Sequence, residues 1–260
     1  MLDTADSVRL GRSGLRISPV VLGCMSFGAP DRGAHGWSLD EEASRPLIRH
    51  ALEAGITTFD TADVYSDGTS EEFVGRALAD FANRDEIVIA TKVHGRMGPG
   101  ANQAGLSRAH ILSGIDASLR RLGTDHVDLY QSHQDDADVP IEDVLGTYAD
   151  LIKAGKVRAI GASNFTAARL AQALDVAEQQ NLPRYESLQP LYNLCDRAVF
   201  ERELEPLVTA RGVGVINYYA LAAGFLTGKY RSAADADKSA RGKSTVDKYL
   251  NPRGLRILAA

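Results

Sequence analysis

Short apolar segments alternate with amphipathic segments along most of this chain. The apolar segments are rich in Val, Ile, Leu and Thr and are nearly continuous, which is typical of strands buried on both faces. Amphipathic segments with helical spacing separate them. The pattern predicts seven strands with a helix after each of the first six, and these strands occupy residues 20–23, 57–60, 87–92, 127–133, 156–161, 185–190 and 212–219.

Start and stop signals place the helices between these strands. Ser38 or Asp40 can cap a helix that ends at Gly55, and later helices are expected over 70–81, 107–122, 140–154 and 199–210, with a loop and then a helix over 163–180. Before the first strand, residues 7–18 alternate around a turn at Arg12-Ser13-Gly14 and predict a hairpin that covers one end of the fold.

Alternating strands and helices indicate a parallel sheet, either open and doubly wound or closed as a (β/α)8 TIM barrel. No strand is followed by the GxGxxG motif that an open dinucleotide-binding sheet normally carries. Asp60 and Lys92 are 32 residues apart, and Lys92 and His133 are 41 apart, which suits successive strand–helix–strand units. We therefore expect a TIM barrel, with residues 1–260 as a single domain.

Composition narrows the classes of partner. The chain of 260 residues carries a formal net charge of −5, so neither nucleic acid nor an anionic membrane is an expected partner. No apolar run approaches the ~20 residues of a membrane span, and the acidic amino terminus does not resemble a signal peptide. Cys24 and Cys195 are far apart and are expected to be free thiols. These features favour a cytoplasmic protein.

Ionisable residues stand at the ends of three successive strands. Asp60, Lys92 and His133 each close an apolar run, and Tyr65 follows Asp60 by five residues. Each alone has an ordinary structural explanation, such as a strand end, a turn or a surface loop. Because carboxyl ends of parallel barrel strands converge at one opening, their joint occurrence predicts a proton-transfer site. No second His or Cys lies at ligand spacing beside His133, so no metal is expected.

Seven motifs in order resemble the aldo-keto reductases, and they span essentially the whole chain. They are LGCMSFG (22–28), FDTADVY (59–65), ATK (90–92), DLYQSH (128–133), IGASNF (160–165), LQPLYNL (188–194) and VINYYALAAGFLTGKY (215–230). The resemblance implies NADPH-dependent reduction of aldehydes or ketones on a TIM barrel. It assigns Tyr65 as proton donor, with Lys92 stabilising the phenolate, Asp60 holding Lys92 and His133 orienting the carbonyl.

The resemblance also implies a set of cofactor contacts. Ser163, Asn164 and Gln189 match residues that bind the nicotinamide carboxamide, and Tyr218 matches the ring that stacks on the nicotinamide. The remaining expected contacts are Asp60, the first-strand residues Cys24 and Met25, and a pyrophosphate loop with Leu221, Ala223, Gly224 and Lys229. Simple packing is the alternative for Tyr218, Cys24 and Met25.

The carboxyl-terminal part departs from the family pattern. Residues 231–250 are polar and charged and predict a loop, after which Asn251 and Pro252 open a final helix. We expect a barrel truncated after strand seven, with strand eight and its helix missing. Its open edges favour self-association. The alternatives are a truncated reductase sequence, a fragment completed by another chain and an inactive product. A nicotinamide-binding regulatory module resembling channel-associated subunits is the rival function.

Overall fold

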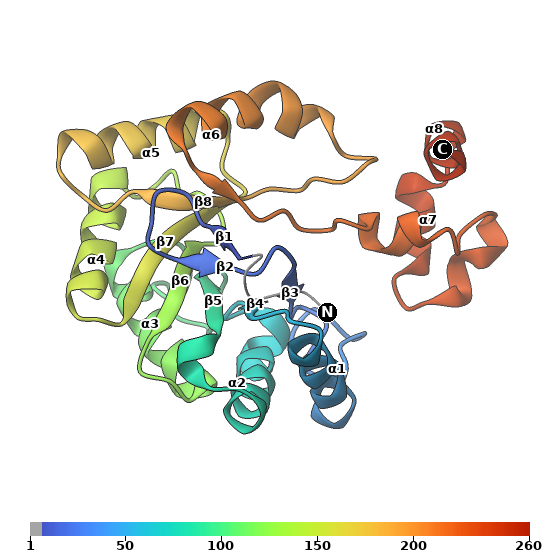
Figure 1. The fold of residues 1–260 in the computed structure, drawn as a ribbon, viewed down its shortest axis with the longest axis horizontal. Coiled ribbons are helices and arrows are strands. Elements are labelled where there is room, and N and C mark those ends of the chain that lie inside the picture. The colour runs from blue at the N-terminus through green and yellow to red at the C-terminus, as the bar shows by residue number, and fades with distance from the viewer. Residues whose placement is uncertain (1–6) are drawn as a thin grey trace.

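A curled, wholly parallel sheet of seven strands forms the centre of the protein (Figure 1). The computed structural model describes residues 7–260. The strands pair in chain order: β3 (Val21–Gly23), β4 (Thr58–Asp60), β5 (Val88–Val93), β6 (Val127–Ser132), β7 (Val157–Ser163), β8 (Tyr185–Gln189) and β9 (Gly214–Val215). Within the described residues β3 and β9 do not pair with each other, so the sheet is a half-barrel rather than a closed barrel. The seven predicted strands and their parallel order are confirmed.

A helix follows each of the first six strands and packs on the outer face of the sheet. These are α1 (Glu41–Glu53), α2 (Thr69–Phe81), α3 (Arg108–Leu122), α4 (Ile141–Lys153), α5 (Ala167–Gln179) and α6 (Glu205–Arg211). The side chains of Asp40, Ser107 and Thr166 each accept a hydrogen bond from the first turn of the helix that follows. A π-helical turn, η4 (Phe200–Leu204), leads into α6, while η2 (Tyr65–Gly68) and η3 (Arg84–Glu86) are 3-10 turns.

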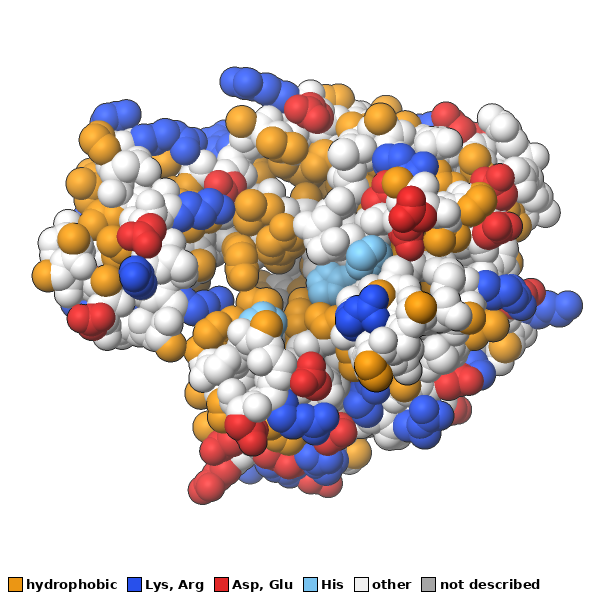
Figure 2. Space-filling model, turned by 180° about the vertical axis from the view of Figure 1, so that it is seen from behind, with side chains coloured by type: hydrophobic (Ala, Val, Ile, Leu, Met, Phe, Trp, Pro, Cys, Tyr) orange, Lys and Arg blue, Asp and Glu red, His pale blue; other side chains and the backbone are white. Residues whose placement is uncertain are grey.

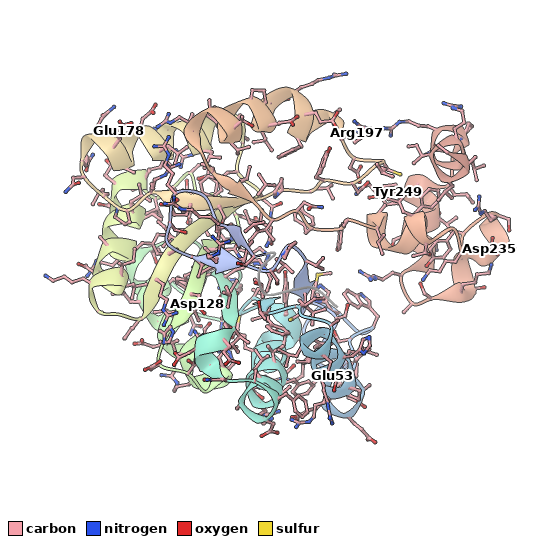
Figure 3. The ribbon with its side chains drawn as sticks, viewed as in Figure 1. Glu53, Asp128, Glu178, Arg197, Asp235 and Tyr249 are labelled. Atoms are coloured by element: carbon pink, nitrogen blue, oxygen red, sulfur yellow. The ribbon has the colours of Figure 1, made fainter. Side chains whose placement is uncertain are left out.

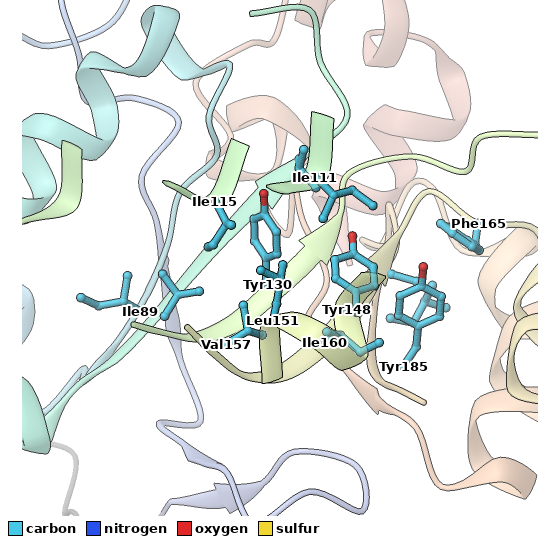
Figure 4. Close-up of a cluster of buried hydrophobic side chains, with 14 of the residues drawn as sticks. Ile89, Ile111, Ile115, Tyr130, Tyr148, Leu151, Val157, Ile160, Phe165 and Tyr185 are labelled. Carbon is cyan, nitrogen blue, oxygen red and sulfur yellow. The ribbon is translucent and has the colours of Figure 1, made fainter. Parts of the chain in front are cut away.

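The main apolar core lies between the sheet and these helices. Figure 4 shows part of it, where Tyr130, Tyr148 and Tyr185 approach one another edge to face among aliphatic side chains. The hydroxyls of Tyr148 and Tyr185 both hydrogen-bond to Ser132 Oγ, at 2.9 and 2.8 Å. This bonding lets Tyr148 and Tyr185 be buried with their hydroxyls paired, whereas the hydroxyl of Tyr130 has no partner within residues 7–260.

The predicted amino-terminal hairpin is present and closes one end of the half-barrel. It consists of β1 (Val8–Arg9) and β2 (Arg16–Ile17), which pair antiparallel. Leu10 and Ile17 pack into a second apolar cluster with side chains from inside the sheet, namely Val88, Ala90, Leu129, Ala159 and Ile216. Ser18, just after β2, donates its N–H to Thr58 Oγ1 and accepts from the Thr58 N–H at the start of β4, so the plugged end is the amino-terminal one.

The expectation of a loop over residues 231–250 was wrong. After β9 the chain forms η5 (Ala222–Thr227), η6 (Ala233–Lys238) and α7 (Gly242–Tyr249), and then the predicted final helix, α8 (Pro252–Ala259), capped by Asn251. These elements share a small apolar cluster of their own, which consists of Cys195, Ala222, Phe225, Tyr230, Val246 and Tyr249. The cluster gives this mostly polar segment an apolar centre.

These carboxyl-terminal elements lie beside the sheet (Figure 1) and rest on two of its loops. Tyr249, labelled in Figure 3, donates a 2.5 Å hydrogen bond to Asp196 in the loop after β8. On the other side Arg241 stacks over the ring of Trp37 in the loop after β3, 4.4 Å from its centroid. The segment thus connects the loops next to the two edges of the sheet. A helix of sufficient length and hydrophobicity to cross a bilayer does not occur within residues 7–260.

Candidate active site

Asp60, Lys92 and Tyr65 meet at the carboxyl ends of β4 and β5. Lys92 is fully buried, and its ammonium donates to Asp60 Oδ2 at 2.7 Å, to the carbonyl of Thr61 at 2.8 Å and to Tyr65 Oη at 3.2 Å. Tyr65 begins the 3-10 turn η2, whose end at Gly68 has a left-handed φ of 88°. The turn folds the phenol back over the strand ends.

The direction of these hydrogen bonds leaves the phenol proton available. An ammonium can only donate, so Tyr65 Oη accepts from Lys92 and keeps its own O–H free. Within residues 7–260 the hydroxyl has no other hydrogen-bond partner. The ammonium also lies 4.9 Å from the centre of the Tyr65 ring. The arrangement therefore holds a proton donor beside a fixed positive charge.

Burial and neighbouring charges determine which groups of this cluster are ionised. Burial raises the pKa of Tyr65 above its ordinary value, and the opposing effect of Lys92 is smaller. Burial alone would lower the pKa of Lys92, but the charges and hydrogen bonds of Asp60 and Tyr65 raise it above its ordinary value. At neutral pH the pair is therefore a neutral phenol and a charged ammonium.

His133 lies beside the Tyr65 ring, at the carboxyl end of β6. The two ring centroids are 5.8 Å apart and the rings are nearly perpendicular. Burial, with contributions from Lys92 and His94, lowers the pKa of His133 to about 3. The imidazole is therefore neutral over the physiological range and can orient a substrate by hydrogen bonding rather than as a cation. The structure brings all four predicted catalytic residues together; their roles stay predictions.

The predicted carboxamide-binding residues lie at the ends of β7 and β8. Ser163 Oγ donates to the carbonyl of Gln189 at 2.9 Å, and Asn164 Nδ2 donates to the carbonyl of His133 at 2.9 Å. Tyr218 Oη donates to Asn164 Oδ1 at 2.8 Å. The side-chain amide of Gln189, although buried, makes no hydrogen bond within residues 7–260. Of these three residues, Gln189 has its amide free for a ligand, and Asn164 is engaged by Tyr218.

The predicted pyrophosphate loop follows β9. Its residues Ala222, Ala223 and Gly224 have φ values of 49°, 54° and 93°, a run of left-handed backbone. The N–H groups of Ala222 and Gly224 donate within the loop, to the carbonyls of Tyr219 and Leu221 at 2.7 and 2.9 Å. Lys229 lies close to Gly224, because a Cβ atom on that glycine would be 3.5 Å from Lys229 Nζ. Leu221 is exposed. In the described chain, no hydrogen bond links this loop to Lys92 or Tyr65.

Cys24 and Met25 follow β3 on the other side of Asp60. The backbone N–H of Cys24 donates to the carbonyl of Asp60 at 2.8 Å, and its fully buried thiol lies over the carbonyl of Leu22. Burial raises the pKa of the Cys24 thiol, so it is not a reactive thiolate. Met25 is partly exposed. Their predicted contact with a cofactor stays a prediction.

Sequence reasoning did not single out two residues that contact this cluster. Gln131 donates to Asp60 Oδ1 at 2.8 Å, and His35 lies between Tyr65 and Trp37, with ring centroids 6.0 and 4.8 Å away. Gln131 was visible as a polar residue inside an apolar strand; His35 sits in an irregular loop with no periodic signal. Figure 2 shows the hollow between the sheet and the carboxyl-terminal helices, lined by hydrophobic side chains, with histidine side chains at its rim.

Comparison with known proteins agrees with this geometry. A reductase of versiconal hemiacetal acetate from Aspergillus parasiticus is 40% identical over 86% of this chain and 69% of its own length. A putative voltage-gated potassium channel subunit beta from Schizosaccharomyces pombe is 40% identical over 85% and 63%. A putative aryl-alcohol dehydrogenase from Saccharomyces cerevisiae is 35% identical over 89% and 72%. The chain spans about two thirds of the length of such relatives.

The match extends beyond single relatives to a family as a whole. The sequence profile of the aldo/keto reductase family matches residues 19–259, which includes every strand of the half-barrel and all four clustered side chains. The chain belongs to the aldo/keto reductase family of oxidoreductases.

Proposed function

We propose that the protein reduces aldehydes or ketones to alcohols and uses NADPH as the hydride source. The observation that carries this proposal is the buried Lys92 ammonium, which is bonded to both Asp60 and Tyr65 and leaves the phenol proton free. A carbonyl becomes an alcohol by gaining a hydride at carbon and a proton at oxygen. This cluster can supply the proton.

The residues of the chain have separate tasks in this proposal. Tyr65 gives its proton to the carbonyl oxygen, and the O–H bond of the phenol breaks as the O–H bond of the alcohol forms. Lys92 stabilises the phenolate that remains, since it already donates to that oxygen. Neutral His133, beside the Tyr65 ring, orients the carbonyl oxygen by a hydrogen bond. Burial excludes water from Lys92 and keeps its charge directed at Tyr65.

The residues present fit a nicotinamide dinucleotide. The unbonded amide of Gln189 can pair with a carboxamide, and the ring of Tyr218 is available for stacking beside it. In the loop after β9, the ammonium of Lys229 lies beside Gly224 and can receive a phosphate. When bound, NADPH supplies the hydride. Ser163 and Asn164 complete the expected carboxamide contacts when the side chain of Asn164 replaces its hydrogen bond from Tyr218 with one to the carboxamide.

The test is Tyr65→Phe, assayed with a generic aldehyde and NADPH. We expect kcat to fall by about a thousandfold or more, because the proton donor is lost. The Kd of Tyr65→Phe for NADPH, measured by protein fluorescence, should change little. Tyr192→Phe is the matched control, since the Tyr192 hydroxyl bonds to Glu201 and not to the cluster. Turnover by Tyr65→Phe at the wild-type rate would refute the role of Tyr65.

A regulatory function is the second candidate, because some of the similar proteins carry the name of a potassium channel subunit. Besides the Schizosaccharomyces pombe protein, a probable voltage-gated potassium channel subunit beta from Oryza sativa is 36% identical over 96% of this chain. In this alternative the protein binds NADPH and conveys the redox state to a partner. Binding occurs under both proposals, so turnover decides. Tight NADPH binding without reduction of any of a panel of aldehydes and ketones would favour the regulatory function.

A further inference from the structure

Gln131 is a fully buried polar side chain in an otherwise apolar strand. It lies opposite Lys92 in the β5–β6 pairing, so both side chains enter the interior of the sheet. Gln131 Nε2 donates to Asp60 Oδ1 at 2.8 Å, while Lys92 donates to Asp60 Oδ2 at 2.7 Å. We propose that Gln131 is a positioning residue: it holds the Asp60 carboxylate in the orientation that directs Lys92 at Tyr65. This inference rests on the proposed carbonyl reduction.

The hydrogen bonds around Lys92 leave no freedom for an alternative arrangement. Its three N–H groups are all used, by Asp60, by the carbonyl of Thr61 and by Tyr65. Within residues 7–260, Asp60 Oδ1 has one donor, the amide of Gln131. Without that donor the carboxylate can rotate, or it keeps a buried oxygen unpaired. Either outcome moves the ammonium relative to the phenol oxygen.

The interior is shaped to accept an amide at this position. A Cβ atom on Gly161, in the next strand, would lie 2.3 Å from Ser187 Oγ and 3.1 Å from Gln131 Cγ, so the glycine makes room for both side chains. Gln131 Oε1 and Ser187 Oγ have no hydrogen-bond partner in the described part of the chain. The NH₂ end of the amide therefore faces Asp60, because a carboxylate needs a donor.

Two substitutions distinguish positioning from packing. Gln131→Met keeps the length of the side chain and removes the donor. Gln131→Glu keeps the shape and places a second carboxyl group against Asp60, where mutual repulsion raises the pKa of one of the two. A protonated glutamate can donate to Asp60 as the amide does. An ionised one cannot.

With a generic aldehyde and NADPH, we expect Gln131→Met to lower kcat by about tenfold or more at every pH. KM and the Kd for NADPH should stay within about twofold, because Gln131 is buried below the strand ends. In Gln131→Glu, kcat should approach the wild-type value at acid pH and fall as pH rises. Ser187→Ala is the matched control, since Ser187 lies in the same interior region without contacting Asp60, and its kcat should be unchanged.

A second measurement does not depend on turnover. In urea unfolding, Gln131→Glu should lose stability as pH rises, relative to Gln131→Met, because its buried carboxyl holds a proton that the unfolded chain releases. If the wild-type protein reduces no carbonyl, the proposed function fails. The urea-unfolding measurement still tests the contact between Gln131 and Asp60 in that case. The inference is overturned if an active wild type and Gln131→Met have equal kcat. It is also overturned if Gln131→Met and Gln131→Glu lose the same amount of kcat at every pH. A stability of Gln131→Glu that depends on pH no more than that of Gln131→Met would overturn it as well.

Discussion

Asp63 is a buried carboxyl group that forms no ion pair with any residue of the range 7–260. It lies two residues before Tyr65, is 1% exposed, and neither of its oxygens has a hydrogen-bond partner of normal geometry within residues 7–260. Burial raises the pKa of Asp63 to about 8, and the nearby Glu71 carboxylate adds to the rise; the Val64 amide, Arg121 and Lys92 oppose it. The group is therefore a neutral acid at pH 7.

The raised pKa makes stability depend on pH in a defined direction. Below about pH 4 the carboxyl of Asp63 is protonated in the folded and unfolded states alike, so it has no effect. Between about pH 4 and the folded-state pKa of about 8, the unfolded chain releases the proton and the folded protein keeps it. Stability then falls by up to about 1.4 kcal/mol per pH unit. Above that pKa the loss is complete.

Asp63→Asn removes this titration and keeps the shape of the side chain. The shift in pKa from about 3.9 to about 8 sets an upper limit of about 6 kcal/mol, and water entry reduces it to ~2–5 kcal/mol. In urea unfolding, the quantity to compare is the free energy of unfolding of Asp63→Asn minus that of the wild type. We expect this difference to be larger at pH 9 than at pH 4 by that amount. The difference should rise through the interval and level off above about pH 8.

Asp67→Asn is the control for this experiment. Asp67 lies in the same loop but is exposed, so its substitution should change stability by ~0.5 kcal/mol or less at every pH. A difference between wild type and Asp63→Asn that is the same at pH 4 and pH 9 would show that Asp63 is already ionised or solvated in the folded protein. The reasoning from burial would then be refuted.

Three further outcomes are expected. Arg121→Met should destabilise the protein by ~3–5 kcal/mol in urea unfolding, because it leaves the buried Glu71 carboxylate without the 2.6 Å ion pair; a loss below ~1 kcal/mol would contradict this. The kcat profile should show no step near pH 6.5 from His133, whose pKa is lowered to about 3, and a step that disappears in His133→Gln would disprove its neutrality. In a fluorescence titration, Tyr218→Phe should bind NADPH at least as tightly as the wild type, because it frees the side chain of Asn164 and keeps the aromatic ring. Tyr218→Ala, which loses the ring, should bind NADPH about tenfold more weakly.

The sequence predicted the sheet and the clustered residues because both depend on local pattern. Buried parallel strands are continuous apolar runs, and the parallel order brings their polar ends together. Asp60, Lys92 and His133 could therefore be placed without any knowledge of long-range contacts. The same reasoning could not find the hydrogen bond from Gln131 to Asp60, because it depends on the register between β5 and β6 and on the inward direction of both side chains.

The helical elements within residues 231–250 could not be predicted for a different reason. Residues 231–250 contain few apolar side chains, so a helical period is hard to recognise in them. Their order comes from contacts with distant residues, such as Tyr249 with Asp196 and Arg241 with Trp37. A single hydrogen bond or a stacked guanidinium leaves no periodic trace along the chain.

The order of the strands has a consequence for how such a chain can recombine with a relative. The predicted proton-transfer residues lie on β4, β5 and β6 and the loops after them, within residues 60–133, while most predicted cofactor contacts lie from the end of β7 onward, within 163–229. Helix α4 (Ile141–Lys153) separates the two sets along the chain. A genetic crossover within α4 could therefore exchange the segment with most predicted cofactor contacts and keep the cluster of Asp60, Tyr65, Lys92 and His133 intact. Among the described side chains, the hydrogen bond from Asn164 to the carbonyl of His133 is one contact that such a chimaera would have to re-form.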